Sequence, residues 1–452
     1  MSHYLLYLTF LLAISARFAV LCAETPSEKV PSAETEIATN EDEDIDYIPE
    51  GSSRTEEYVP DYRGSQLWKI AYNTRVLKPL EEEAYAQVWN FQKGKHLDVL
   101  IHGAGVERAK EILRANNVNY TVQIHDLKKA ISEENPPKKY IQDLVNRNGL
   151  PMTWQAYHRL ADIHKYLDFV AKNNPDLVST QVIGKSKENR DLKIVRISNN
   201  NPSNKAIWID GGIHAREWIS PAAATFIINE LIEEWEDKPE YIRRIDWYIL
   251  PVTNPDGYEY SHSTDRLWRK SRTKNGNGQC MGVDLNRNYG YKWGGKGVSK
   301  SPCSEIYGGS SAFSEPETQA IQNFMKRLGA GKVTGSMSLH SYGQYILYPW
   351  GYDRAVPPDH TDLKNLAIEA RQKMAEVGGN WYTVGPAAAS LYPASGGSDD
   401  WAKGTMGIKY AYTIELRDNG RHGFVLPASH IIGSGREAMA FADTLAKYCA
   451  NL

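Results

Sequence analysis

Two histidines and an acidic residue follow apolar runs of the sequence at a spacing that suits metal binding. His214 and Glu217 are three residues apart just after the run at 206–210, and His340 ends the run at 336–340. Two imidazoles and one carboxylate form a catalytic zinc site whose fourth position stays open for water. Taken alone, a His-x-x-Glu pair is more often a surface pair than a ligand pair. The metal interpretation therefore depends on whether the surrounding elements bring these side chains together.

The elements that would position them are short apolar runs that alternate with helical patterns across residues 148–452. Buried strands are predicted at 206–210, 247–252, 336–340 and 408–416, and helices at 153–172 and 221–236. This alternation favours an α/β domain with a mixed, largely parallel sheet flanked by helices. Ligands of such sheets bind outside the carboxyl ends of the strands. His214, His340 and Glu415, which lie at three predicted strand ends, are therefore expected to converge.

A smaller α/β unit is predicted within residues 62–147. Its apolar patterns predict strands at 67–72, 96–101 and 120–124, and helices at 80–91 and 106–115. A charged stretch follows, which carries Lys138, Lys139 and Arg147. Because exposed connectors of this kind are preferred sites of proteolysis, we expect cleavage there, with Arg147 as the preferred position.

The first 61 residues contribute to neither unit. Residues 1–23 have the apolar core of a signal peptide, interrupted by Arg17, and residues 24–61 are acidic and poor in apolar side chains, which predicts a disordered extension. The formal net charge of -3 provides no broad basic surface for nucleic acid. We expect a secreted, extracellular protein that binds neither nucleic acid nor membrane and acts as a monomer.

Removal of residues 1–23 would leave three cysteines in an oxidising compartment, so that two of the three can pair. Cys280 and Cys303 bracket a loop rich in Gly and Asn, where a disulfide would restrict the unfolded chain by roughly 3 kcal/mol. Cys449, near the C-terminus, would then be a free thiol.

Seven ordered motifs of this chain closely resemble those of the zinc metallocarboxypeptidases of the pancreatic A/B type. They are HAREW, TNPDG, RLWRK, VDLNRN, LHSY, ASGGSDDW and ELRD. The resemblance extends from about Tyr62 to the end of the chain. It implies the metallocarboxypeptidase fold with a small α/β prodomain in residues 62–147, and a catalytic domain in residues 148–452 that binds one Zn²⁺ per chain.

The resemblance also implies roles for individual residues around the metal. His214, Glu217 and His340 match the zinc ligands, Glu415 the catalytic base, and Arg269 the arginine that polarises the scissile carbonyl. These roles suit the side chains, since a carboxylate can take the proton of an attacking water and a permanently charged guanidinium can stabilise the developing oxyanion.

A second group of matched residues would bind the substrate. Asn286 and Arg287 match the pair that grips the terminal carboxylate, Tyr392 a mobile tyrosine, and Arg216 a residue lining the cleft. A planar guanidinium binds a carboxylate in bidentate geometry, which would restrict cleavage to chain ends. Asp284 matches the carboxylate that orients His214, although a turn residue is an equally plausible interpretation of it.

Specificity would depend on Asp399, the residue expected at the base of the pocket for the departing side chain. By the resemblance, an acidic residue there marks the B type, which favours C-terminal Lys or Arg, and places this chain closest to procarboxypeptidase B. Masking of Asp399 by a neighbour would instead give A-type or broad specificity. The partners implied are peptide or protein C-termini and an activating trypsin-like protease.

Two alternatives belong to other functional classes. A catalytically inactive peptide-binding module of the same fold should lack the base or the electrophile, yet Glu415 and Arg269 are both present. A zinc amidase acting on non-peptide substrates would leave Asn286, Arg287 and Tyr392 without a purpose.

Overall fold

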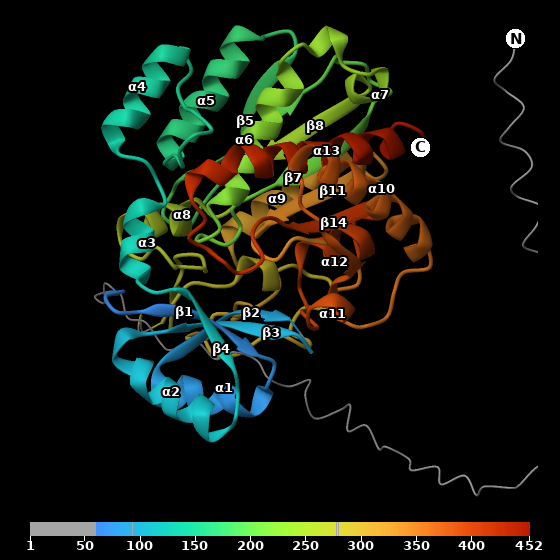
Figure 1. The fold of residues 1–452 in the computed structure, drawn as a ribbon. Helices are drawn as coiled ribbons and strands as arrows, with labels where there is room; N and C mark the ends of the chain where they lie inside the picture. The colour runs from blue at the N-terminus through green and yellow to red at the C-terminus, as the bar shows by residue number, and fades with distance from the viewer. Residues whose placement is uncertain (1–59, 93, 277, 279) are drawn as a thin grey trace, which may run out of the picture. The chain divides into compact units, whose positions relative to one another are not determined.

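The computed structural model describes residues 60–92, 94–276, 278 and 280–452 (Figure 1). The predicted signal peptide and nearly all of the acidic extension lie outside the described residues. No helix within the described ranges is long and apolar enough to cross a bilayer.

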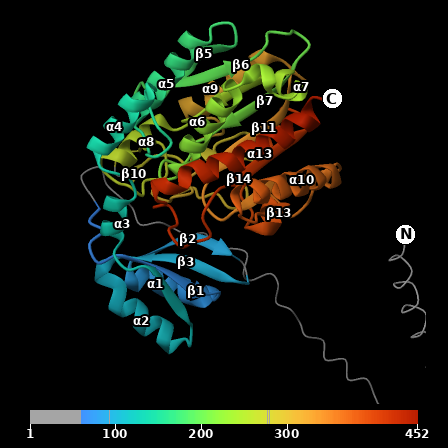
Figure 2. The ribbon, with the colours of Figure 1, turned by 45° about the horizontal axis from the view of Figure 1, so that its top comes forward.

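The N-terminal unit is a four-stranded antiparallel sheet with two helices on one face (Figure 2). The strands lie in the order β2 (Ala86–Gln92), β3 (His96–Ile101), β1 (Gln66–Ala71) and β4 (Tyr120–Ile124). The helices are α1 (Leu77–Ala84) and α2 (Val106–Ala115), which close a core with Trp68, Ile70 and Val99. Three strands and one helix agree with the sequence-based prediction.

The helix predicted at 80–91 is confirmed only as far as Ala84, and its second half is wrong. α1 ends at Ala84 because Tyr85 adopts a left-handed conformation with φ of 51°, and the following residues form β2. Pairing of β2 with β3 outweighs the helical pattern read from the sequence.

The charged connector forms two helices, α3 (Leu127–Glu133) and α4 (Lys138–Asn148). Lys138 and Lys139 begin α4 and are exposed, and Arg147 is exposed near its end. Glu134, between the two helices, is buried. The positions expected to be cleaved are therefore accessible side chains on a helix rather than in an irregular loop.

The larger unit is built on one eight-stranded mixed sheet. Its order is β13 (Thr383–Pro386), β12 (Tyr345–Tyr348), β14 (Tyr410–Glu415), β11 (Val333–His340), β7 (Lys205–Asp210), β8 (Ile245–Leu250), β6 (Asp191–Ile197) and β5 (Val178–Lys185). The four central strands β14, β11, β7 and β8 run parallel, whereas β6 and β5 are antiparallel to their neighbours. This is the mixed, helix-flanked architecture expected from the sequence.

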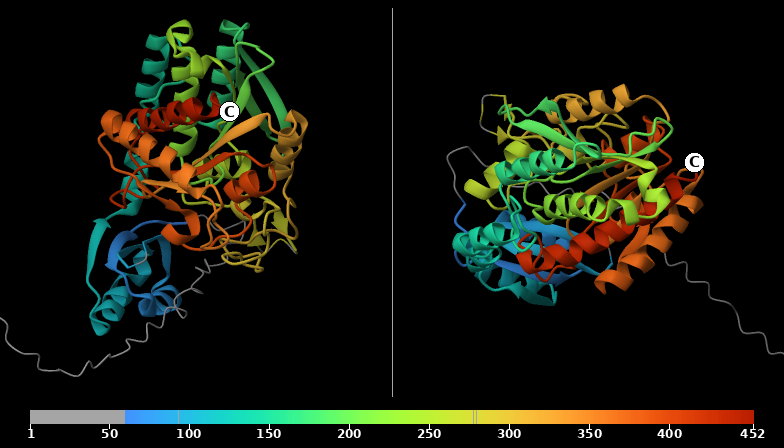
Figure 3. Two further views of the ribbon diagram at one scale, coloured as in Figure 1. Left: turned by 90° about the vertical axis from the view of Figure 1, so that its right-hand side faces the viewer. Right: turned by 90° about the horizontal axis from the view of Figure 1, so that it is seen from above.

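Helices cover both faces of this sheet, which explains why its central strands are apolar on both sides. One face packs against α5 (Leu160–Asn173), α6 (Ile219–Ile232), α10 (His360–Gly378) and α13 (Ile431–Cys449), and the other against α9 (Pro316–Leu328) and α12 (Ser398–Gly404). In β7, Ile207 and Ile209 face the first group while Ala206 and Trp208 face the second. Figure 3 shows α10 and α13, in orange and red, side by side.

The remaining helices are short. They are α7 (Glu240–Arg243), α8 (Pro255–Ser263) and α11 (Ala387–Ser390). The helix predicted from Thr153 begins only at Leu160, because the preceding residues form a loop in which the backbone N–H of Thr153 donates to His158 Nε2 at 3.0 Å.

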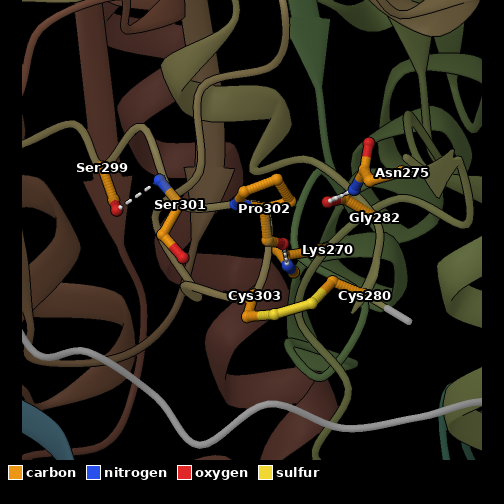
Figure 4. The surroundings of a disulfide bond; sticks show 8 residues. All are labelled: Lys270, Asn275, Cys280, Gly282, Ser299, Ser301, Pro302 and Cys303. Carbon is orange, nitrogen blue, oxygen red and sulfur yellow. Dashed lines mark hydrogen bonds between the residues drawn. A yellow bond between two sulfur atoms is a disulfide. The ribbon is translucent and has the colours of Figure 1, made fainter. Parts of the chain in front are cut away.

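A disulfide joins Cys280 and Cys303 (Figure 4). Cys449 is a buried free cysteine. Cys280 lies in the short strand β10 (Cys280–Met281), which pairs with β9 (Lys274–Asn275). Beside the disulfide, Lys270 Nζ donates to the carbonyl of Pro302 at 2.9 Å. The disulfide considered from the sequence is therefore present and connects two loops close to Arg269.

Candidate active site

His214, Glu217 and His340 converge at the carboxyl ends of β7 and β11. His214 Nδ1 lies 2.8 Å from Glu217 Oε1 and 3.2 Å from His340 Nδ1, which is in turn 3.2 Å from Glu217 Oε2. All three side chains are buried. A turn at Gly212, with φ of 64°, lets the chain leave β7 and carry His214 back over the strand end.

These side chains fit a zinc ion. Two ligands bound about 2.0–2.1 Å from a tetrahedral zinc are roughly 3.3 Å apart, which agrees with the 3.2 Å between the two imidazole nitrogens. The candidate ligand atoms of the two imidazoles and the carboxylate all lie within 4.8 Å of one another, and this donor set matches that of a catalytic zinc site.

Asp284 holds the outer side of this cluster. It receives a hydrogen bond from His214 Nε2 at 3.1 Å and two from Arg269, from Nη2 at 2.8 Å and Nε at 3.2 Å. Burial opposes the charged form, but Arg269 and Arg287 hold the pKa of Asp284 well below its usual range. An ionised Asp284 retains the proton on Nε2 of His214, so that the lone pair of Nδ1 is available to a metal.

Arg269 is charged and largely buried, with 12 % of its side chain exposed. Burial alone would lower the pKa of this guanidinium, but Asp284 and Glu217, and more weakly Tyr392, raise it above its ordinary value. The carbonyl of Arg269 also accepts a hydrogen bond from the N–H of Ala215 at 3.0 Å, so that its loop is tied to the loop of His214.

Glu415 ends β14 directly beside His340, its partner in the parallel register. Burial raises the pKa of Glu415 to about 7, with Glu217 adding to the increase and His340 opposing it. A carboxyl with a pKa near neutrality can both accept and return a proton.

Asn286 and Arg287 lie in a single 3₁₀ turn after Asp284. Arg287 donates from Nε to the carbonyl of Gly297 and from Nη1 to that of Asn286, both at 2.9 Å. Asn286 Oδ1 accepts from the N–H of Ser398 at 2.9 Å, which orients the amide. Since Ser398 begins α12, the turn is joined directly to the helix that carries Asp399.

Asp399 and Asp400 are adjacent and both buried. Asp400 accepts hydrogen bonds from the N–H groups of Gly351 and Tyr352 at 2.8 and 2.7 Å. Burial raises the pKa of Asp399, while the charges of His340 and Arg287 oppose that increase. Asp400 is thus held by backbone donors, whereas Asp399 lies next to the Asn286 and Arg287 turn.

Arg216 and Tyr392 occupy different surroundings. The guanidinium of Arg216 lies 4.0 Å above the ring of Phe424 and is buried, whereas Tyr392 is 45 % exposed in the loop after α11. The structure therefore brings the three predicted metal ligands, Glu415 and Arg269 together and places Tyr392 in an exposed loop.

One residue that holds the site together was not identified from the sequence. Asn254, in the TNPDG motif, donates from Nδ2 to the carbonyls of Lys270 at 2.9 Å and Ile213 at 3.3 Å, and accepts from the N–H of Gly257 at 3.0 Å. It thereby fastens the loop of His214 to the loop of Arg269. The sequence feature that marks Asn254 is the turn-forming run Asn-Pro-Asp-Gly. This run predicts a local turn but not the long-range contacts of the Asn254 side chain.

The N-terminal unit and its connector contact residues next to this site. Glu134 forms a buried ion pair with Arg266, at 2.6 and 2.9 Å. Asp98 accepts a hydrogen bond from Tyr342 at 3.0 Å, and the ring of Trp89 packs on Phe424 at 5.1 Å. Tyr342 follows His340 by two residues, and Phe424 is the ring beneath Arg216.

Comparisons with known proteins agree with this arrangement. Residues 163–441 match the zinc carboxypeptidase family, and residues 72–134 match the carboxypeptidase activation peptide. The chain is 41% identical over 298 residues to carboxypeptidase B of Astacus astacus, covering 66% of this chain and 98% of that protein. It is 35% identical over 402 residues to carboxypeptidase A1 of Bos taurus, covering 86% and 95%.

The fold is also similar to that of a solved structure. The crystal structure of thrombin activatable fibrinolysis inhibitor aligns with a TM-score of 0.78 at 32% identity, covering 86% of this chain and 100% of that chain.

Proposed function

Because this chain belongs to the zinc carboxypeptidase family, and is therefore a zinc metallopeptidase with an activation peptide, we propose that it releases C-terminal Lys and Arg from peptides once that activation peptide is removed. The observation that carries the proposal is the convergence of His214, Glu217 and His340 beside Glu415 and Arg269. The chain would bind one zinc, held by the two imidazoles and Glu217.

Zinc and the side chains of the protein would contribute different parts of the hydrolysis. When bound, zinc supplies a Lewis acid and lowers the pKa of a water molecule to about 7. Glu415 takes the proton of the attacking water and returns it to the leaving amine, as a positioned carboxylate can. Arg269 remains charged and stabilises the negative charge that develops on the carbonyl oxygen, an effect of about 3–4 kcal/mol for a single well-placed donor.

Binding of the substrate terminus would explain why only the last residue is removed. Arg287 and Asn286 grip the terminal carboxylate, since both are fixed by backbone contacts before substrate arrives. Tyr392 closes over the substrate from its exposed loop, and Arg216 lines the cleft on the side of Phe424.

Asp399 supports preference for basic residues. A cationic side chain entering the pocket would pair with this buried carboxylate, whereas an apolar side chain would leave it unpaired. The second candidate is A-type specificity. It is favoured by the raised pKa of Asp399, because a neutral carboxyl would tolerate an apolar side chain.

Residues 62–147 act as the prodomain and residues 148–452 as the catalytic domain in this proposal. The Glu134–Arg266 pair and the contacts of Trp89 and Asp98 support docking of the prodomain beside the substrate cleft. A trypsin-like protease would cut after Arg147 or at Lys138 or Lys139, which are exposed. The Cys280–Cys303 disulfide supports secretion, and the active enzyme would be an extracellular monomer.

Matched peptides that end in Arg, Lys, Phe or Leu test the specificity. We expect kcat/KM to be highest for Arg and Lys, and Asp399→Asn to abolish this preference because it removes the charge but keeps the shape. Asp399→Ile should favour Phe and Leu. A wild-type enzyme that prefers Phe or Leu would establish the A-type candidate instead.

A further inference from the structure

Two polar side chains are presented to solvent at the start of β4, one from the residue before the strand and one from within it. Asn119 and Thr121 are both exposed, while the ring of Tyr120 between them stacks on Trp68 at 4.3 Å. The carbonyl of Asn119 accepts a hydrogen bond from the N–H of Ala71 at 2.9 Å, so the backbone is already extended there. Because side chains of an extended chain alternate, Asn119 and Thr121 lie on the same side.

Asn-x-Thr is the acceptor sequence of N-linked glycosylation when x is not proline. Asn119-Tyr120-Thr121 is the only such sequence in the chain, since Asn201-Pro202-Ser203 has proline in the middle position. We propose that Asn119 carries an N-linked oligosaccharide. The proposal rests on the secretion proposed above, which the disulfide supports independently of this turn.

The modification uses a lipid pyrophosphate-linked oligosaccharide of the secretory pathway as the donor. Nδ2 of Asn119 forms a bond to the anomeric carbon of the sugar, the bond from that carbon to the pyrophosphate breaks, and the lipid pyrophosphate leaves with the electron pair. The amide nitrogen loses one proton. An exposed amide can enter this reaction without unfolding the sheet, because the residue that anchors the turn is Tyr120.

An oligosaccharide at Asn119 would have two effects, which follow from the position of this residue. β4 is an edge strand of the four-stranded sheet, and a bulky hydrophilic group at its start would hinder pairing with a strand of another chain. Asn119 also precedes every proposed cleavage position. The zymogen would therefore carry the oligosaccharide, and the activated enzyme would not.

The test is intact mass measurement of the chain expressed in animal cells, before and after treatment with peptide-N-glycosidase. We expect the zymogen to lose the mass of one oligosaccharide and to gain about 1 Da by conversion of Asn119 to Asp. After cleavage at the connector, this change should occur only in the N-terminal fragment. Asn119→Gln and Thr121→Ala should abolish it, while Thr121→Ser, which keeps the acceptor hydroxyl, should retain it.

Three results would contradict the proposal, and the first two of them distinguish its failure from a failure of secretion. A chain recovered from the medium without the modification would overturn glycosylation and leave secretion intact. A chain retained in the cytosol without the modification would overturn both. Loss of the oligosaccharide in Thr121→Ser as well as in Thr121→Ala would also contradict the assigned acceptor sequence.

Discussion

The buried ion pair between Glu134 and Arg266 should dominate the retention of the prodomain. Their side chains are 2 % and 5 % exposed, and two hydrogen bonds join them. Arg266 is otherwise anchored within the catalytic domain, to the carbonyls of Arg216 and Phe424 at 2.7 Å and against the ring of Trp218 at 3.7 Å. Glu134→Gln would therefore leave Arg266 in place with its charge unpaired.

The expected loss of affinity follows from this geometry. Removing one partner of a buried pair costs about 3–5 kcal/mol. At about 1.4 kcal/mol for each factor of ten, the cleaved prodomain should bind roughly one hundredfold to a few thousandfold more weakly. Because Glu134 precedes the proposed cleavage positions, the pair joins two separate fragments after cleavage and the loss can be measured directly.

The assay is the rate at which activity appears after trypsin cleaves the connector, with prodomain dissociation followed by size-exclusion chromatography. Glu133→Gln is the matched control, since Glu133 is the exposed neighbour in α3 and lies 3.9 Å from Lys129 in an exposed ion pair. Glu134→Gln should release activity far faster than this control. Equal dissociation rates for the two variants would refute the importance of the ion pair.

Two further predictions concern proton transfer by Glu415 in the active site and the pH dependence of prodomain binding. Glu415→Gln should abolish nearly all turnover while metal analysis still finds one zinc per chain, because the amide cannot accept the proton of the water; near-normal turnover would mean that the base is wrongly assigned. Burial raises the pKa of Asp98 to about 7 when the prodomain is docked, whereas an exposed aspartate has a pKa of about 3.9. Between pH 4 and pH 7 the docked prodomain therefore binds more protons than the free prodomain. Prodomain binding should therefore weaken as the pH rises from 4 to 7, and Asp98→Asn should flatten that dependence; an unchanged pH profile in this variant would exclude Asp98 as its source.

The sequence predicted the position of site residues that lie at the ends of recognisable strand patterns. His214, His340 and Glu415 could be placed together because each lies at or just past the end of an apolar run, and the carboxyl ends of parallel strands meet at one edge of a sheet. The direct pairing of His340 with Glu415 in the register of β11 and β14 is consistent with that reasoning. The roles assigned to these residues remain proposals.

Two of the parts that were missed depend on contacts between distant segments. Glu134 and Arg266 are 132 positions apart, and neither residue has a local signal that predicts its partner. The helix predicted at 80–91 failed beyond Ala84 for a different reason, because pairing with β3, the next strand along the chain, decides the conformation of β2. The sequence around Asn254 predicted a turn. It did not predict that the side chain of Asn254 would join the loop of His214 to the loop of Arg269.

The most direct test of the central claim is mass spectrometry of a peptide mixture incubated with the trypsin-activated protein, with and without a zinc chelator. Peptides should lose single residues from their C-termini, the reaction should stop with the chelator, and added zinc should restore it. His340→Ala should lose metal and activity together. Cleavage at internal bonds, or C-terminal trimming that persists in the chelator and in His340→Ala, would contradict the account.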